Sequence, residues 1–332
     1  MKNKFLLFSI LLLSAAVFQV NAITLKLASL LPSGTEWDRS LNSMANDWKE
    51  VTDGRVQIKI YPGGIAGGEA DVIRKMRIGQ IDMAVLTSTG MMSIVPDSFV
   101  MNLPFMLESE DELDFIVENV TPMFDEAFKE KGFIVLTWSK TGWVNFFTRD
   151  KVITPEDMKK TKFSGPVTQP ELTSCFKKMG MNVIPVDLPD LLMSLQSGMV
   201  DSIYTAPMAA ASYQWFAITD NMLDMRVSPV LGGIVITEKA WRRIPDKYKE
   251  ELFAAARSMS KDFYSEAERL EAKAIDVMVD NGLTINEPEA DTQEKWQKLL
   301  GVDYSVLVGD DNIVSKEIYN EVSTMLKEYR SK

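Results

Sequence analysis

The feature that most limits how this chain can fold is a pattern that occurs twice, in which an apolar-faced helix ends at a glycine and leads into a buried strand. In residues 191–204, leucine and methionine recur at helical spacing, Gly198 interrupts the helix, and an apolar strand follows. Residues 72–86 repeat this order around Gly79. The repeat predicts two α/β lobes whose strand ends face each other.

Aligning the two glycines also places Asp82 on Asp201. Aspartates beside turns commonly accept hydrogen bonds from nearby backbone, so we interpret both as structural rather than chemical residues. Helix–glycine–strand is also the ordinary join of any α/β protein. Two explanations therefore stay open: the two segments are equivalent parts of two lobes, or a connection that is common in α/β proteins occurs twice by chance.

The N-terminus has the three parts of a secretory signal peptide. A basic start is followed by an apolar run over residues 5–18 and by small residues ending at Ala22. The run is shorter than the roughly 20 residues that span a bilayer. We therefore expect residues 1–22 to be cleaved and the mature protein to be periplasmic, with an uncleaved membrane anchor as the alternative.

Composition excludes several classes of function. Histidine is absent, which removes Ser-His and Cys-His catalysis and the commonest metal ligand, so neither a metal nor a cofactor is expected. The formal charge of −11 argues against nucleic acid or an anionic membrane as partner. The single cysteine, Cys175, cannot form an internal disulfide, and its apolar neighbours indicate a packed helix face.

Other segments have the signals that two α/β lobes require. Ser33 or Thr35 is placed to cap a helix, and residues 232–236 are typical of a buried strand that returns to the first lobe. A charged amphipathic helix is expected over residues 108–128. The glycine-rich run 63–68 lacks the Lys-Ser/Thr ending of a phosphate-binding loop, so we interpret it as a tight lead-in to the next helix.

A long helix is predicted near the C-terminus. Between Pro245 and Asn281 there is no glycine or proline, and apolar residues recur at three- and four-residue steps. A helix of roughly 36 residues would be about 54 Å long, which exceeds one lobe, so it should cross both. We expect a first lobe of residues 23–145 plus 230–275 and a second of residues 146–229 plus 276–332.

Several segments together resemble the substrate-binding subunit of TRAP transporters, the DctP-like family. The resemblance covers the mature chain and is carried by residues 63–69 (GGIAGGE), 79–84 (GQIDMA), 103–105 (LPF), 154–159 (TPEDMK) and 195–201 (LQSGMVD). It implies an α/β, two-lobe fold similar to the type II periplasmic binding proteins, with a long helix crossing both lobes. It also implies a protein that closes over a small-molecule ligand and delivers it to a membrane permease driven by an ion gradient.

The chain departs from the family pattern at the positions that bind a carboxylate. Ser164 stands where the family commonly has an arginine that clamps the substrate carboxylate through two parallel hydrogen bonds. A second family arginine would fall near residues 144–145, and a family asparagine at 205–206, and both are missing. Residues 204–216 resemble instead the subgroup that works with a tetratricopeptide-repeat lipoprotein, which the resemblance therefore implies as a partner.

These departures predict the kind of ligand. Without the arginine clamp, and with a negative net charge, the pocket should prefer a neutral or largely apolar molecule. A small organic acid bound through another basic residue, such as Arg149 or Lys140, is the alternative. Ten residues are expected to form the ligand-binding walls: Trp37, Thr87, Met91 and Phe105 from the first lobe, and Trp143, Phe147, Ser164, Tyr204, Met208 and Trp215 from the second.

Two other classes of function compete with solute binding. An exported enzyme such as a glycosidase needs only two suitably spaced carboxylates, but the acidic clusters of this chain occur on helix faces suited to solvent. A pure interaction protein is the other class, in which the uncharged apolar run 208–216 would be an exposed docking surface. We expect a binding protein rather than an enzyme.

Overall fold

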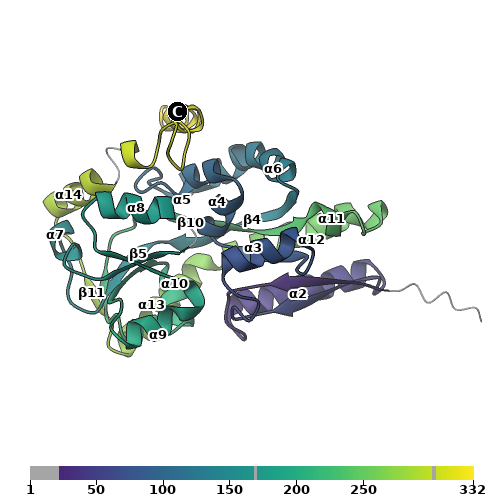
Figure 1. Ribbon diagram of the computed structural model, residues 1–332, viewed down its shortest axis with the longest axis horizontal. Helices are drawn as coiled ribbons and strands as arrows, with labels where there is room; N and C mark the ends of the chain where they lie inside the picture. The colour runs from purple at the N-terminus through teal and green to yellow at the C-terminus, as the bar shows by residue number, and fades with distance from the viewer. Residues whose placement is uncertain (1–21, 168–169, 301–303) are drawn as a thin grey trace, which may run out of the picture.

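The computed structural model describes residues 22–167, 170–300 and 304–332. Two β-sheets lie side by side along the long axis of the molecule, and helices cover the faces of each (Figure 1). The two-lobe α/β organisation predicted from the repeat is confirmed. The predicted signal peptide falls almost wholly outside the described residues.

The first sheet has five strands in the order β2–β1–β3–β10–β4. β1 is parallel to both of its neighbours, whereas β10 is antiparallel to β3 and to β4. Successive side chains of a strand point to opposite faces, so Ile234 and Val235 of β10 belong to different cores. The strands are β1 (Ile23–Ala28), β2 (Val56–Tyr61), β3 (Met83–Leu86), β4 (Phe133–Trp143) and β10 (Pro229–Thr237).

The second sheet has six strands in the order β11–β9–β5–β8–β6–β7. β5 is antiparallel to β8 and β9, and β6 is parallel to β7 and β8. The strands are β5 (Asn145–Thr148), β6 (Phe163–Pro166), β7 (Val183–Val186), β8 (Ser202–Thr205), β9 (Asn221–Leu223) and β11 (Thr284–Asn286).

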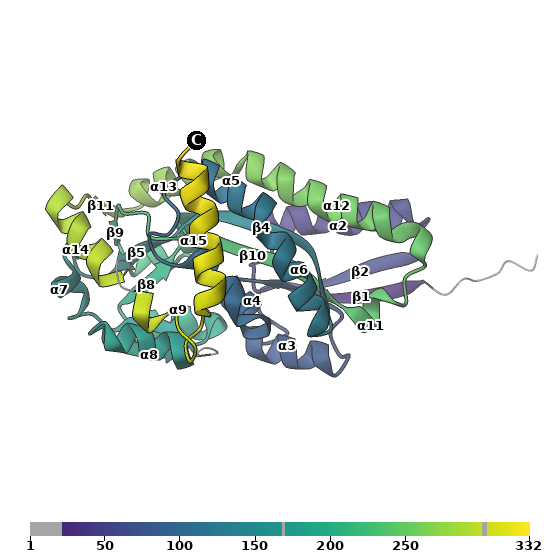
Figure 2. The same cartoon turned by 90° about the horizontal axis from the view of Figure 1, so that it is seen from above.

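Helices lie on both faces of the first sheet, with α2 and α12 on one side and α3, α4 and α6 on the other (Figure 2). Of the two predicted cap residues, Thr35 caps α2, since its hydroxyl accepts from the Asp38 N–H. The helix expected over 108–128 is two helices, because Pro122 starts a new one. The elements are α2 (Glu36–Val51), α3 (Glu69–Arg77), α4 (Ser88–Ile94), η1 (Pro96–Asn102), α5 (Glu110–Asn119), α6 (Thr121–Glu130) and α11 (Glu238–Trp241).

The second sheet carries shorter helices. Those that follow β6, β7 and β8 begin beside the carboxyl ends of these strands, which is where α/β proteins usually bind ligands. The elements are α7 (Pro155–Met158), α8 (Pro170–Lys178), η2 (Leu188–Asp190), α9 (Leu191–Gln196), α10 (Pro207–Ser212), η3 (Trp215–Ala217), α14 (Ala290–Leu300) and η4 (Tyr304–Val306).

Several segments connect the lobes. β4 leads directly into β5 through Val144, and this residue exchanges backbone hydrogen bonds of 2.9 and 3.1 Å with Ser228 and Val227 of the returning segment. The predicted 36-residue helix is interrupted at Glu266, so it forms α12 (Asp246–Ser265) and α13 (Ala267–Asp280). α12 contacts α2 and β4, while α13 contacts α10, so the pair crosses both lobes as expected (Figure 2).

The two aspartates of the repeat have the same structural role. The Asp82 carboxylate accepts from the Lys26 N–H at 2.9 Å, and the Asp82 N–H donates to the Lys26 carbonyl at 3.0 Å. Asp201 makes the same pair of bonds with Lys162, at 2.6 and 3.0 Å. Each aspartate therefore fixes its strand to the neighbouring parallel segment, which supports equivalent lobes and structural aspartates.

The division of the chain into lobe ranges stays a prediction. The last helix, α15 (Lys316–Arg330), falls in the range expected for the second lobe, but it contacts η1, and its Arg330 pairs with Glu112 of α5 at 2.7 Å. Among the described residues no helix is long and apolar enough to cross a bilayer. The same residues contain no group of three or more acidic or cysteine side chains placed to hold a metal ion.

Candidate functional site

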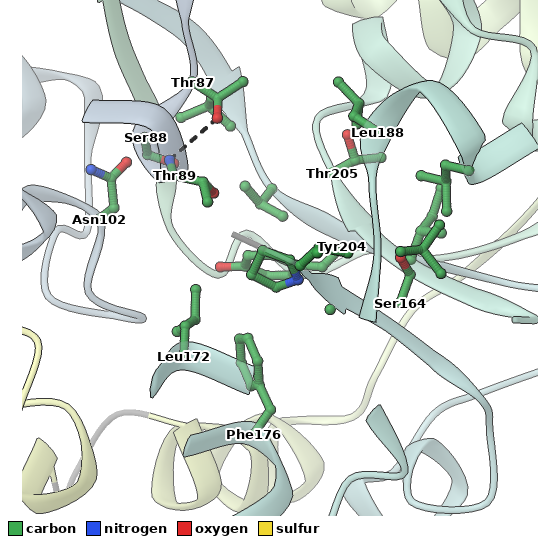
Figure 3. Close-up of a pocket in the computed structure, with 18 of the residues that line it drawn as sticks. Thr87, Ser88, Thr89, Asn102, Ser164, Leu172, Phe176, Leu188, Tyr204 and Thr205 are labelled. Atoms are coloured by element: carbon green, nitrogen blue, oxygen red, sulfur yellow. Dashed lines mark hydrogen bonds between the residues drawn. The ribbon is translucent and has the colours of Figure 1, made fainter. Parts of the chain in front are cut away.

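A cavity of about 240 Å³ lies between the two sheets, beside the carboxyl ends of strands from both lobes (Figure 3). A second cavity of about 160 Å³ adjoins it and extends toward α2 and α10. Both cavities are lined by Leu30, Thr87, Leu188, Thr205, Trp215 and Val230. Together they offer space for one small organic molecule held between the lobes.

The polar part of the first-lobe wall is organised by a buried carboxylate. Glu69, the first residue of α3, accepts from the Thr87 N–H at 2.6 Å and from the Thr87 hydroxyl at 2.9 Å. The Thr87 hydroxyl in turn accepts from the Thr89 N–H and caps α4 (Figure 3). Glu69 therefore ties the starts of two helices together at the edge of the cavity.

The second-lobe wall is mainly aromatic. The Tyr204 ring lies 5.3 Å from the Phe146 ring and 6.4 Å from the Phe176 ring, between ring centroids. Its hydroxyl lies 2.5 Å from the Ser228 hydroxyl, which satisfies the polar end of a buried side chain. Ser164 of β6 is half-buried in the same wall (Figure 3).

A stacked aromatic pair joins the lobes on another side. The rings of Tyr213 and Trp215 are 4.4 Å apart and nearly parallel, and Gln214 between them has left-handed backbone with φ of 59°. The Tyr213 hydroxyl donates to the Leu30 carbonyl of the first lobe at 2.6 Å. This hydrogen bond therefore connects the lobes directly over the cavity.

Glu69 and Asp187 are the charged residues among the described lining of both cavities, and neither lysine nor arginine contributes to it. Burial raises the pKa of the Glu69 carboxyl to about 7, against the lowering effect of its hydrogen bonds, and the nearby Asp187 adds to the rise. Burial also raises the pKa of Asp187. The cavity thus has an acidic end without a compensating cation, which disfavours anions.

The two basic residues named as possible substitutes for the family arginine are engaged elsewhere. Arg149 donates to the Leu195 carbonyl at 2.6 Å. Lys140 pairs with Asp114 and lies over the Tyr264 ring, 3.0 Å from its centroid. Neither residue is part of the cavity lining.

The structure brings together six of the ten residues expected in the ligand-binding walls. Phe105 and Trp143 line a separate open cleft, whereas Met91 and Phe147 are buried in the cores of the two lobes. Their binding roles stay predictions. The six residues that line the joined cavities are Trp37, Thr87, Ser164, Tyr204, Met208 and Trp215.

Sequence reasoning missed several lining residues. Glu69 follows the glycine run and starts a helix, so its sequence context indicated only a favourable first-turn acid. Asp187 and Leu188 lie between β7 and α9 and carried no signal beyond a turn. Tyr213 lies inside the run 208–216. Its position two residues before the predicted wall residue Trp215 was the signal that could have identified it as a lining residue.

Comparisons with known proteins agree with this arrangement. The family model for bacterial extracellular solute-binding protein family 7 matches residues 27–308. A solute-binding protein of Chromohalobacter salexigens is 26% identical over 258 residues, covering 75% of this chain and 74% of the relative. The sialic acid-binding periplasmic protein SiaP of Vibrio cholerae is 20% identical, covering 93% of this chain and 96% of the relative.

Solved structures share the fold. A TRAP periplasmic solute-binding protein of Xanthobacter autotrophicus with bound β-D-galacturonate has a TM-score of 0.83 at 17% identity, covering 90% of this chain and 99% of that one. One from Chromohalobacter salexigens with bound D-glucuronate has a TM-score of 0.78 at 23% identity, covering 92% and 97%. The chain belongs to bacterial extracellular solute-binding protein family 7, the DctP family of TRAP substrate-binding proteins, and is a periplasmic binding protein rather than an enzyme.

Proposed function

We propose that this protein captures an uncharged, largely apolar solute between its lobes and delivers it to a TRAP-type membrane permease driven by an ion gradient. The observation that carries the proposal is the charge of the cavity lining. Ser164, which the family resemblance places at the position of the carboxylate-binding arginine, lies in the wall, and the described lining holds two carboxylates and no cation.

The energetics favour apolar ligands over small acids. A charge-assisted hydrogen bond contributes about 1.5–3 kcal/mol, so losing a two-bonded arginine weakens acid binding by roughly two to four powers of ten. Burial of apolar surface contributes about 25 cal/mol per Å² whatever the ligand charge. Most of the lining is apolar, including the rings of Phe176, Tyr204 and Trp215.

Binding of a small organic acid is the second candidate. It is favoured by the ligands of similar proteins, which include galacturonate, glucuronate and succinate. In this chain an acid would have to replace the missing arginine by hydroxyl groups such as those of Ser164 and Thr205, close to two carboxylates. Neutral hydroxyl donors form weaker hydrogen bonds to a carboxylate than arginine does.

Mass spectrometry of the molecules released from purified protein tests the proposal, together with thermal shifts in the presence of galacturonate, glucuronate and succinate. We expect release of a neutral or lipid-like molecule and no stabilisation by the three acids. Strong stabilisation by one of these acids, without release of an apolar molecule, would contradict the proposal and support the second candidate.

A tetratricopeptide-repeat lipoprotein as partner stays a separate proposal, which rests on the resemblance of residues 204–216 to one subgroup. In the structure this run is a wall of the cavity more than an outer surface, since Met208 and Trp215 line it and Ala210 is fully buried. Co-purification of a tagged chain from its native host tests for the partner. Recovery of the permease subunits without such a lipoprotein would contradict this proposal alone.

A further inference from the structure

An acidic residue of the second lobe lies directly against the first lobe. Asp187 precedes η2, and its carboxylate accepts from the Leu188 N–H at 3.1 Å. A Cβ atom added to Gly68, which precedes α3 of the first lobe, would lie 2.2 Å from Oδ2 of Asp187. Nearby, a Cβ atom at Gly64 would lie 3.2 Å from the Pro189 ring. The segments 64–68 and 187–189 are therefore packed together across the cleft.

The residue after Gly68 is the buried carboxylate of the cavity wall. Glu69 is 7% exposed, and its hydrogen-bond donors are the Thr87 N–H and hydroxyl and the Gly90 N–H. These donors are neutral, so the carboxylate has no ion-pair partner among them. In this closed arrangement burial is the main cause that raises the pKa of Glu69, and the Asp187 carboxylate of the other lobe raises it further.

The charged groups around Glu69 and Asp187 do not neutralise the negative charge of these two carboxylates. On α3, Asp71 is paired with Arg74 at 2.6 Å, and Lys75 donates to the Ala66 carbonyl at 2.5 Å. Asp190 of η2 and Asp71 of α3 both raise the pKa of Asp187. The facing residue after α10 is Tyr213, whose pKa is raised by burial and by Glu69, so its hydroxyl stays protonated.

We propose that closure of the lobes takes up a proton at the Glu69–Asp187 pair, so that ligand capture strengthens as pH falls. The proposal rests on the proposed function in one respect, namely that the ligand is held between closing lobes. It adds a linkage between capture and pH that an apolar ligand alone would not produce.

The direction of the effect follows from the linkage relation. A group whose pKa is higher in the closed than in the open state favours closure fully below its open-state pKa, and this contribution is lost as pH rises toward the closed-state pKa. For Glu69 the window extends at most from the ordinary 4.5 to about 7. Protonation of Asp187 favours closure in the same direction, because its pKa is also raised.

The test uses the full mature chain and N-phenyl-1-naphthylamine, an apolar fluorescent probe that stays uncharged between pH 5 and pH 8. We expect its Kd to rise about three- to thirtyfold from pH 5 to pH 7.5 and to level off above that. Asp187→Asn keeps an acceptor for the Leu188 N–H and should flatten the dependence. Asp276→Asn removes an exposed acid from the same lobe and should leave the dependence unchanged.

Small-angle scattering of the ligand-free protein gives a second readout over the same pH range. The radius of gyration should increase with pH in the unmodified protein and stay constant in Asp187→Asn. A pH-independent Kd, or equal slopes in the unmodified and Asp187→Asn proteins, would overturn the proton linkage and leave the proposed function intact. Failure of the probe to bind, with pH-dependent closure by scattering, would contradict the apolar ligand and support the linkage.

Discussion

Replacing Tyr213 by phenylalanine tests whether the closed arrangement of the lobes contributes to ligand affinity. The Tyr213 hydroxyl donates to the Leu30 carbonyl at 2.6 Å, and this bond joins the residue that follows α10 in the second lobe to the segment after β1 of the first. In an open form both groups would be hydrated. The substitution therefore acts on closure while the ring remains available to stack on Trp215.

The magnitude follows from the net value of one hydrogen bond. Such a bond contributes about 0.5–1.5 kcal/mol, so its loss should weaken binding by roughly two- to twelvefold. Fluorescence titration with N-phenyl-1-naphthylamine measures the change at constant pH. The free energy of unfolding within each lobe should change little, because the bond does not lie inside either core.

Tyr248→Phe is the matched control, because Tyr248 is a buried tyrosine of the first-lobe core, away from the cleft. Its affinity for the probe should equal that of the unmodified protein. An unchanged Kd in Tyr213→Phe would refute the argument that this contact stabilises the ligand-bound state. An equal loss of affinity in both variants would point to a general loss of folding instead.

Three further substitutions test other parts of the structure. Gly68→Ala places a Cβ atom 2.2 Å from Asp187 Oδ2, and should disfavour closure by about 1–3 kcal/mol, seen as a larger radius of gyration in scattering. Ser164→Arg should raise affinity for glucuronate at least about tenfold in calorimetric titration, since an arginine restores paired hydrogen bonds to a carboxylate; no gain would show that position 164 does not determine acid binding. Arg330→Ala leaves Glu112 of α5 without its cation and should lower the free energy of unfolding by roughly 1–3 kcal/mol at pH 7 in urea titrations. Burial raises the pKa of Glu112, but Arg330 holds it below the ordinary value, so this stabilisation should be lost as pH falls below about 4.5; an unchanged midpoint would contradict the role of the pair.

Local signals in the sequence predicted much of the fold. The equivalence of Asp82 and Asp201 was visible because each follows a helix–glycine–strand join within a few residues. Thr154 likewise caps α7, since its hydroxyl accepts from the Asp157 N–H while the Asp157 carboxylate accepts from the Thr154 N–H. Such contacts span only a few residues, so periodicity and residue type indicate them.

The choice between core and cavity wall could not be made from the sequence. Phe146 and Phe147 are adjacent on β5, and both are buried because helices and strands cover both faces of the sheet. Trp143 ends β4 at the crossing between lobes, where its indole N–H donates to Glu110 at 2.5 Å. Apolar residues at strand ends therefore look alike in sequence, whether they lie in a core, a hinge or a ligand cavity of the folded protein.

The break in the long helix has a similar origin. Nothing in the sequence between Pro245 and Asn281 interrupts a helix, yet Glu266, with φ of −101° and ψ of −5°, separates α12 from α13. α12 packs on α2, and α13 packs on α10, so each half follows the surface of a different lobe. Tertiary packing therefore overrides helix propensity at the position where the supporting surface changes.

Glu69 and Asp187 add a second reason, besides the missing arginine at position 164, why the cavity should bind acids weakly. If Ser164 were the single difference from carboxylate-binding proteins, the cavity would be neutral, and an acid would lose the clamp without meeting repulsion. Glu69 and Asp187 add electrostatic repulsion. An acid could therefore bind at this end of the cavity only if the acid itself or one of the two carboxylates were protonated. An uncharged ligand meets neither cost, because it carries no charge that the two carboxylates could repel. The same two carboxylates therefore select against anions and link capture of a neutral solute to proton uptake.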